Sequence, residues 1–160
     1  MPKITTLTHY LGIDPGEHGG AALISRGRLV ECCQFDKLTE HEIAAWFFEL
    51  HNEVIGCLEK VWARPGNASR AAFAFGWNYG MARTLLIANN IPFEEPIPRT
   101  WQKALGIKPR DKQESITNFK NRLKAKAHEL FPKDSAQINK SVCDAVLIAE
   151  WLRRQQHNGG

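Results

Sequence analysis

Short apolar runs separated by turn residues open the chain and predict three consecutive strands. The runs are His9 to Asp14, Gly20 to Ser25 and Arg28 to Phe35. The dipeptides Gly19-Gly20 and Arg26-Gly27 lie between them, and glycine-containing pairs of this kind mark tight turns. The pattern therefore predicts an antiparallel meander at the start of the chain.

The apolar positions then take up a helical period. Thr39 and Glu42 form a capping-box pattern, which predicts a helix that continues to about Glu53. The run from Val54 to Val61 has the length and composition of a buried strand. A long helix is expected from Ala71 to about Asn89. This order of elements indicates an α/β fold.

The long helix carries an apolar stripe that we expect to pack on the sheet. Its members are Phe73, Trp77, Met81, Leu85 and Ala88. Gly76 and Gly80 lie four residues apart, a spacing that lets another helix or backbone approach closely. The start of the helix has more aromatic residues than packing needs, so Phe73 or Phe75 has base stacking as an alternative role.

Shorter elements complete the chain. In order they are a strand from Ile91 to Ile97, a helix start from Arg99 to Lys103, a polar linker from Lys108 to Lys112, a helix from Ser115 to Leu130 and a last helix from about Ser141 to Arg154. We expect one domain over residues 1–156 and a disordered tail over residues 157–160.

Composition narrows the class of protein. The chain is 43% apolar and 24% charged, as in soluble globular proteins. Its net charge of +4 and pI near 9.0 are compatible with a polyanionic partner. The four cysteines have no zinc-binding spacing, and neither a signal peptide nor a membrane-spanning run is seen. A reducing cytoplasm is therefore the expected compartment, with no membrane association.

Carboxylates at two strand ends are the first candidates for chemistry. Asp14 lies at the mouth of the first strand, and Glu59 lies near the end of the fourth. If these strands are neighbours, both side chains open at the same end of the sheet. Oxygen ligands of this kind suit hard cations such as Mg²⁺. A turn at Asp14-Pro15-Gly16 and a lysine partner for Glu59 are the structural alternatives.

A third carboxylate, Asp144, lies one turn inside the last helix. The helix dipole alone favours an acid at that place. The residues that follow Asp144 are strongly apolar, however, so we expect this turn to face the sheet.

Basic residues gather in the second half of the chain. The helix from Ser115 to Leu130 has an expected outer face with Lys120, Arg122, Lys124 and Lys126, an arrangement that is usually only solvated. Nearby positions add Arg99, Lys103, Lys108, Arg110 and Lys112. Together they predict a surface for phosphates. The loop from Trp62 to Arg70 contributes Arg64 and Arg70 directly after Glu59.

The element order and the three acids together resemble the ribonuclease H-like nuclease fold, and more narrowly a RuvC-type Holliday junction resolvase. The matching motifs are Gly12-Ile13-Asp14-Pro15-Gly16, Leu58-Glu59-Lys60-Val61 and the stretch from Lys140 to Ala149. The stretch from Phe75 to Lys103 is similar to the phage and chloroplast branches of that family. The resemblance implies a five-stranded mixed sheet flanked by helices, in a bacterial or phage-infected cell or an organelle.

The resemblance also implies a chemistry. Asp14, Glu59 and Asp144 would hold two Mg²⁺ or Mn²⁺ ions roughly 3.5–4 Å apart, for hydrolysis of a phosphodiester. Lys140 would contact phosphate. The partners implied are a four-way DNA junction and a second copy of the chain, because paired cuts need two opposed active sites. The helix from Ala71 to Asn89 is the candidate dimer seam.

One position departs from the family pattern. Family members usually carry an Asp or His a few residues before the last aspartate, and here Ser141 stands three residues before Asp144. Asn139 or Ser141 is the candidate replacement ligand, and Asp134 lies upstream on a loop. Completion of the metal site by water, an inactivating substitution and a junction-binding protein that does not cut are all open explanations.

Other functions fit parts of the pattern. The sequence Ile13-Asp14-Pro15-Gly16 also resembles the phosphate loop of actin-like ATPases and sugar kinases, which need two such lobes where this length supplies one. No nucleotide cofactor is therefore expected. A ribonuclease on the same fold, such as a processor of pre-ribosomal RNA, is a further alternative, distinguishable by substrate preference.

Overall fold

A computed structural model describes residues 8–50, 53–62, 66 and 68–158. Its centre is a mixed five-stranded sheet with the strand order β3-β2-β1-β4-β5. The strands are β1 (His9–Asp14), β2 (Gly20–Ser25), β3 (Arg28–Gln34), β4 (Val54–Leu58) and β5 (Phe93–Glu94). The predicted five-stranded α/β fold is thus confirmed.

The pairing of the strands follows from the turns that the sequence contains. β1, β2 and β3 are antiparallel neighbours, because short turns join them. β4 returns after a helix and pairs parallel to β1, with His9 opposite Val54 and Ile13 opposite Leu58. This parallel pairing puts the ends of β1 and β4 at one edge of the sheet.

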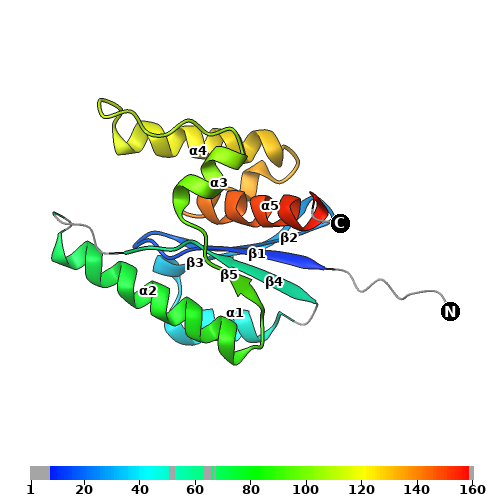
Figure 1. Ribbon diagram of the computed structural model, residues 1–160. Helices are drawn as coiled ribbons and strands as arrows, with labels where there is room; N and C mark the ends of the chain where they lie inside the picture. Colours follow the sequence, from blue (N-terminus) through cyan, green and yellow to red (C-terminus); the bar gives the residue numbers. More distant parts are fainter. Residues whose placement is uncertain (1–7, 51–52, 63–65, 67, 159–160) are drawn as a thin grey trace.

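Helices cover both faces of the sheet (Figure 1). On one face lie α1 (Glu40–Phe48) and α2 (Ser69–Ala88), and on the other lie α3 (Pro98–Ala104), α4 (Ile116–Leu130) and α5 (Cys143–Asn158). Short 3-10 turns η1 (Phe35–Lys37) and η2 (Ser135–Gln137) complete the fold. No helix among the described residues combines the length and apolar character needed to cross a bilayer.

Two apolar clusters hold the layers together. Leu11 and Ile13 of β1 pack with Phe47 of α1 and Leu86 of α2 on one face. On the other face Trp101 of α3 and the apolar side of α5 pack on β1, β2 and β4. β1 is buried along its whole length, so the residue at its end is fixed by packing on both sides.

Gly12 sets how closely α5 lies over β1. A Cβ atom at this position would lie 2.1 Å from the carbonyl oxygen of Ala145 and 2.4 Å from the backbone nitrogen of Ala149. Both distances are far below van der Waals contact. The helix can therefore approach the strand this closely only because residue 12 is glycine, and this approach brings the first turn of α5 to the end of β1.

Several predicted element boundaries were wrong. α1 ends at Phe48 rather than near Glu53, and β4 ends at Leu58, so Glu59 follows the strand. The strand predicted from Ile91 to Ile97 is reduced to two residues, since prolines at 92 and 96 cannot donate to a sheet ladder. α5 extends to Asn158, so residues 157 and 158 of the predicted tail are helical, while residues 159–160 lie outside the described part.

Candidate metal centre at the sheet edge

Asp14 and Glu59 are neighbours at the edge where β1 and β4 end. The backbone N–H of Glu59 donates to the carbonyl oxygen of Ile13 at 3.0 Å, which continues the parallel ladder by one step. Both carboxylates are buried, at 6% and 8% exposed. Oδ1 of Asp14 accepts a 3.0 Å hydrogen bond from the N–H of Gly16, so the following turn orients the carboxylate. The predicted adjacency of these acids is confirmed.

Asp144 joins them from the first turn of α5. Asn139 caps that helix, because its Oδ1 accepts from the backbone N–H groups of Ser141 and Val142 at 2.8 and 3.1 Å. Its Nδ2 donates to Gln34 of β3. The Asn139 oxygen is thus engaged in capping, which argues against the predicted role as a metal ligand. Ser141 is partly buried in the turn before α5.

Lys120 of α4 also belongs to this cluster. Its Nζ lies 2.8 Å from Oδ2 of Asp144 and 3.9 Å from Oδ2 of Asp14. Only 28% of its side chain is exposed. The expectation that Lys120 belongs to a solvated outer face of the helix was wrong. The pattern of lysines along this helix contains no signal that singles it out.

Trp101 of α3 holds Glu59 in place. The indole is fully buried, and its Nε1–H donates to Oε1 of Glu59 at 2.9 Å. A buried carboxylate needs such donors to offset lost hydration. Trp101 was not predicted as a site residue, although it lies in the stretch from Arg99 to Lys103 that supported the family resemblance.

Burial and the repulsion of neighbouring carboxylates raise the pKa of Asp14 and that of Glu59. The pKa of Asp14 is raised from 3.8 to about 6, first by burial and then by the charge of Asp144, while Lys120 and the Gly16 N–H oppose the rise. Burial, followed by the charges of Asp14 and Asp144, raises the pKa of Glu59. For Lys120 burial lowers the pKa, but the charges of Asp144 and Asp14 outweigh it and the pKa is raised. The cluster therefore carries excess negative charge.

This donor set suits a hard cation. Its ligands are carboxylate oxygens, and the ammonium of Lys120 already lies where positive charge is needed between Asp14 and Asp144. As the side chains stand, no group of three or more His, Cys, Asp or Glu side chains in the described ranges surrounds one point closely enough to hold a metal. A metal would therefore require small movements of these side chains.

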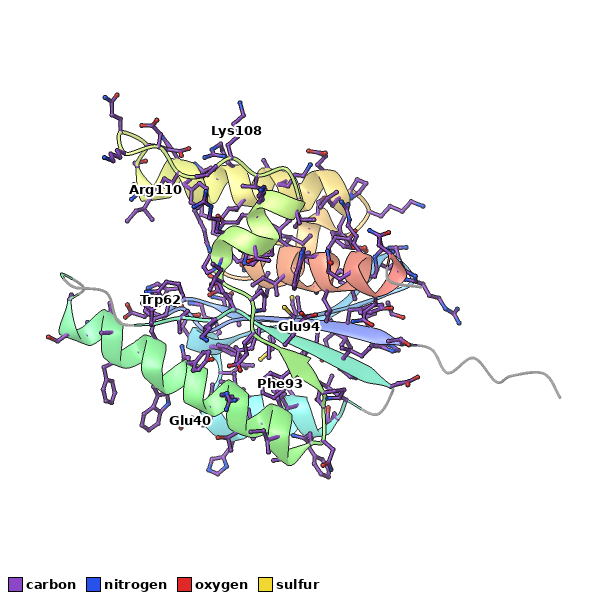
Figure 2. All side chains as sticks on the ribbon, viewed as in Figure 1. Glu40, Trp62, Phe93, Glu94, Lys108 and Arg110 are labelled. Carbon is purple, nitrogen blue, oxygen red and sulfur yellow. The ribbon has the colours of Figure 1, made fainter. Side chains whose placement is uncertain are left out.

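An aromatic groove opens beside Glu59. Its volume is about 400 Å³. The residues that line it are Glu59, Lys60, Val61, Trp62, Phe75, Pro98, Ile116 and Phe119. Figure 2 shows Trp62 at the edge of the sheet layer, next to α2 and α3. Phe75 is partly buried and reaches toward the turn after Asp14, near Gly16.

A second groove, of about 820 Å³, runs between α3 and the linker to α4. Three predicted DNA-binding residues line it, namely Lys103, Lys108 and Arg110. Figure 2 shows Lys108 and Arg110 on this linker, on the same side of the sheet as α3 and α4. Lys112 is exposed further along the linker, and Lys140 is exposed in the turn before α5.

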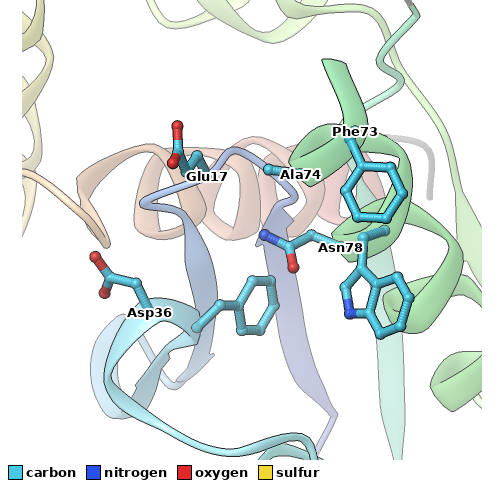
Figure 3. A pocket seen from close by; sticks show the side chains of 7 residues that line it. Glu17, Asp36, Phe73, Ala74 and Asn78 are labelled. Carbon is cyan, nitrogen blue, oxygen red and sulfur yellow. The ribbon is translucent and has the colours of Figure 1, made fainter. Parts of the chain in front are cut away.

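Two of the other predicted contacts, Phe73 and Arg70, lie beside Glu17 instead of lining either groove. Phe73 is 70% exposed, and its ring centroid lies 6.0 Å from that of Trp77, itself 55% exposed. The expectation that both pack in the core was therefore wrong. Figure 3 shows Phe73 and Asn78 on one side of a shallow pocket and Glu17 and Asp36 on the other. The side chain of Arg70 is exposed, and its Nε lies 3.6 Å from Oε1 of Glu17. Arg64 lies outside the described residues.

The fold matches solved structures along nearly the whole chain. RuvC of T. thermophilus in complex with a Holliday junction substrate matches with a TM-score of 0.66 and 17% identity, over 96% of each chain. A further structure of Thermus thermophilus RuvC matches with a TM-score of 0.61 and 17% identity, over 94% of this chain and 96% of that one. No protein-family model and no curated protein matches the chain. The fold is therefore of the RuvC type, within the ribonuclease H-like folds.

Proposed function

We propose that this protein is a structure-selective DNA endonuclease that resolves four-way junctions. The observation that carries the proposal is the convergence of Asp14, Glu59 and Asp144, from β1, β4 and α5, at one edge of a RuvC-type sheet. Such a group serves metal-dependent hydrolysis of phosphodiesters. The similar protein of T. thermophilus was solved with a Holliday junction substrate, which supports branched DNA as the substrate here.

Asp14, Glu59 and Asp144 are the proposed ligands of Mg²⁺ or Mn²⁺. When bound, the metal would activate a water molecule and stabilise the leaving oxygen. The protein's own part is to hold the three carboxylates against their mutual repulsion. The Gly16 N–H and the Trp101 indole do this for Asp14 and Glu59, since each donates to a carboxylate oxygen.

The two grooves supply the proposed DNA contacts. The aromatic groove beside Glu59 lies within reach of a base next to the scissile phosphate, and Phe75 or Trp62 is suited to stack on it. Lys103, Lys108 and Arg110 form a basic wall that suits the phosphates of a DNA arm. Lys112 and Lys140 are exposed and are further candidates for phosphate contacts.

A homodimer would provide two opposed active sites for paired cuts. α2 has the features of an interface: Phe73 and Trp77 are exposed, and a Cβ added at Gly76 or Gly80 would meet nothing within 4 Å. Beside them lies a groove of about 390 Å³ between α1 and α2, lined by Trp77, Met81 and Leu85 among others. Exposed apolar surface of this kind favours a protein contact.

A second candidate function is binding of junctions without cutting. Two observations favour it: Ser141 stands where family members usually have a ligand, and Lys120 lies between Asp14 and Asp144. Both lower the capacity of the site for metal. The basic and aromatic grooves would serve either function.

Cleavage of matched substrates tests the proposal. A labelled four-way junction, a linear duplex of the same sequence and an RNA–DNA hybrid are incubated with the protein, with Mg²⁺ or with EDTA. Resolution requires cutting of the junction alone, and only with Mg²⁺. Tight junction binding without any cutting would favour the second candidate, and preferred cutting of the hybrid would favour a ribonuclease.

A further inference from the structure

The charge balance around the carboxylate cluster limits how many metal ions it can take. Three carboxylates and the ammonium of Lys120 together carry two net negative charges when all are ionised. Among the described residues, the charged groups that shift the pKa of Glu59 are Asp14, Asp144 and Lys120. One divalent ion therefore neutralises the cluster, and a second would leave it with excess positive charge.

The available oxygen ligands also favour a single metal ion. A second ion needs further oxygen ligands on the side of Asp144, where the chain offers Asn139 and Ser141. The Asn139 oxygen already accepts two backbone N–H groups of the α5 cap. Ser141 contributes only a neutral hydroxyl, which offsets no charge.

Lys120 lies beside the two carboxylates that a second metal ion would bridge. Its Nζ lies within 4 Å of both Asp144 and Asp14, and only 28% of its side chain is exposed. An ammonium here places a positive charge beside the same two carboxylates that a second ion would bridge. A positioned ammonium can also neutralise charge that develops on a phosphate, as a metal ion does.

We infer that Asp14, Glu59 and Asp144 bind a single divalent cation, and that Lys120 supplies the positive charge that a second ion would supply in a site with a fourth acidic ligand. The inference rests on the proposed function, because it concerns the metal of that same site. It assigns Lys120 a part in the site that no pattern in the sequence indicated.

Counting of bound Mn²⁺ tests the inference without any cleavage. Free and bound Mn²⁺ are measured by electron paramagnetic resonance during titration of the wild-type protein, and isothermal calorimetry provides an independent stoichiometry. One ion per wild-type chain is expected. Two ions per wild-type chain, or none, would overturn the inference.

Two variants distinguish the effect of Lys120 on the number of bound ions from the effect of the protein's overall charge. The double variant Lys120→Met with Ser141→Asp removes the ammonium and adds a carboxylate, so two Mn²⁺ ions per chain are expected. Lys124→Met, on the same helix, removes an equal charge from a side chain that shifts the pKa of neither Asp14 nor Glu59, and should keep one ion. Circular dichroism verifies that each variant is folded. A folded double variant that still binds one ion would contradict the role of Lys120, and if it does not fold, the wild-type count alone decides.

The outcome is separable from that of the proposed function. A wild-type chain that binds one Mn²⁺ but cuts no junction would leave the count and the role of Lys120 intact, while the endonuclease activity would be refuted.

Discussion

The ammonium group of Lys120 lies 2.8 Å from Oδ2 of Asp144, and this ion pair joins α4 to α5 at the acidic end of the sheet. Because Lys120 is mostly buried there, the pair is screened by water less than a surface ion pair. The helices α4 and α5 are thus linked by two charged residues of the site itself. Changes at the carboxylates should therefore alter stability as well as activity.

Asp14→Asn should stabilise the protein at neutral pH. A carboxyl whose pKa is raised on folding binds its proton more tightly in the folded state, so stability falls as pH rises from 3.8 to about 6 and stays lower above that. A rise of this size corresponds to about 3 kcal/mol at pH 7.5. Asparagine removes the charge and keeps the acceptor for Gly16. Urea unfolding should show an increase in unfolding free energy of up to this amount, about half as large at pH 5.

The exposed residue Asp111 provides the control for this effect. Asp111→Asn removes one negative charge from an exposed position on the linker before α4. Because this side chain is not buried, the unfolding free energy should stay unchanged within about 0.5 kcal/mol at both pH values. A loss of stability in Asp14→Asn at pH 7.5 would show that the charge of Asp14 is well compensated by Lys120.

Trp101→Phe should weaken both the fold and the metal site. The substitution removes the donor to Glu59 and leaves a buried carboxylate short of one partner, at a cost of about 1–3 kcal/mol. Trp46→Phe is the matched control, because its buried indole N–H has no hydrogen-bond partner among the described residues. Urea unfolding and Mn²⁺ titration of both variants measure the difference. Equal effects of the two variants would refute the positioning role of Trp101.

Phe75→Ala should reduce junction affinity by about one to two orders of magnitude, since base stacking contributes roughly 1–3 kcal/mol. Phe75 lines the groove beside Glu59, whereas Phe73 lies in the pocket with Glu17 and Asp36. Fluorescence anisotropy with a labelled junction should therefore show a loss for Phe75→Ala and little change for Phe73→Ala. If Phe75→Ala binds normally but melts at a lower temperature, then Phe75 serves packing alone.

Trp77→Lys should convert a dimer into a monomer without loss of folding. The side chain is 55% exposed, so its replacement leaves no cavity in the core, and a lysine on α2 would meet its own copy across a two-fold interface. Val30→Lys introduces the same charge at a 49% exposed position of β3 and should leave the dimer intact. Light scattering at micromolar concentration measures the mass. A wild-type monomer, alone and with junction DNA, would refute the dimer.

The adjacency of Asp14 and Glu59 was predictable because it depends on short stretches of sequence. Turn residues such as Gly19-Gly20 fix the meander, and parallel pairing of two apolar runs is enough to bring Asp14 and Glu59 together. The close packing of α5 at Gly12 then brings Asp144 to them. No residue outside these runs is needed for the adjacency.

Positions set by packing between helices were not predictable in the same way. The stripe on α2 has a helical period, but the sheet covers only its second half, where Ala82 and Leu86 are buried, so Phe73 and Trp77 project outward. Nothing in the sequence distinguishes Lys120 from the other basic residues of α4, and only the way α4 lies on α5 brings it to the acids. Which side chains of a helix are buried depends on how the helices and the sheet pack together.

Cleavage of a four-way junction by the wild-type protein and by Asp14→Asn tests the central claim most directly. Both proteins are first matched for junction binding in EDTA, because lysine and arginine contacts rather than Asp14 carry the affinity. On addition of Mg²⁺, the wild-type protein should cut two opposed strands, and Asp14→Asn should bind equally well without cutting. Near-normal cutting by Asp14→Asn, or no cutting by the wild-type protein, would contradict the account.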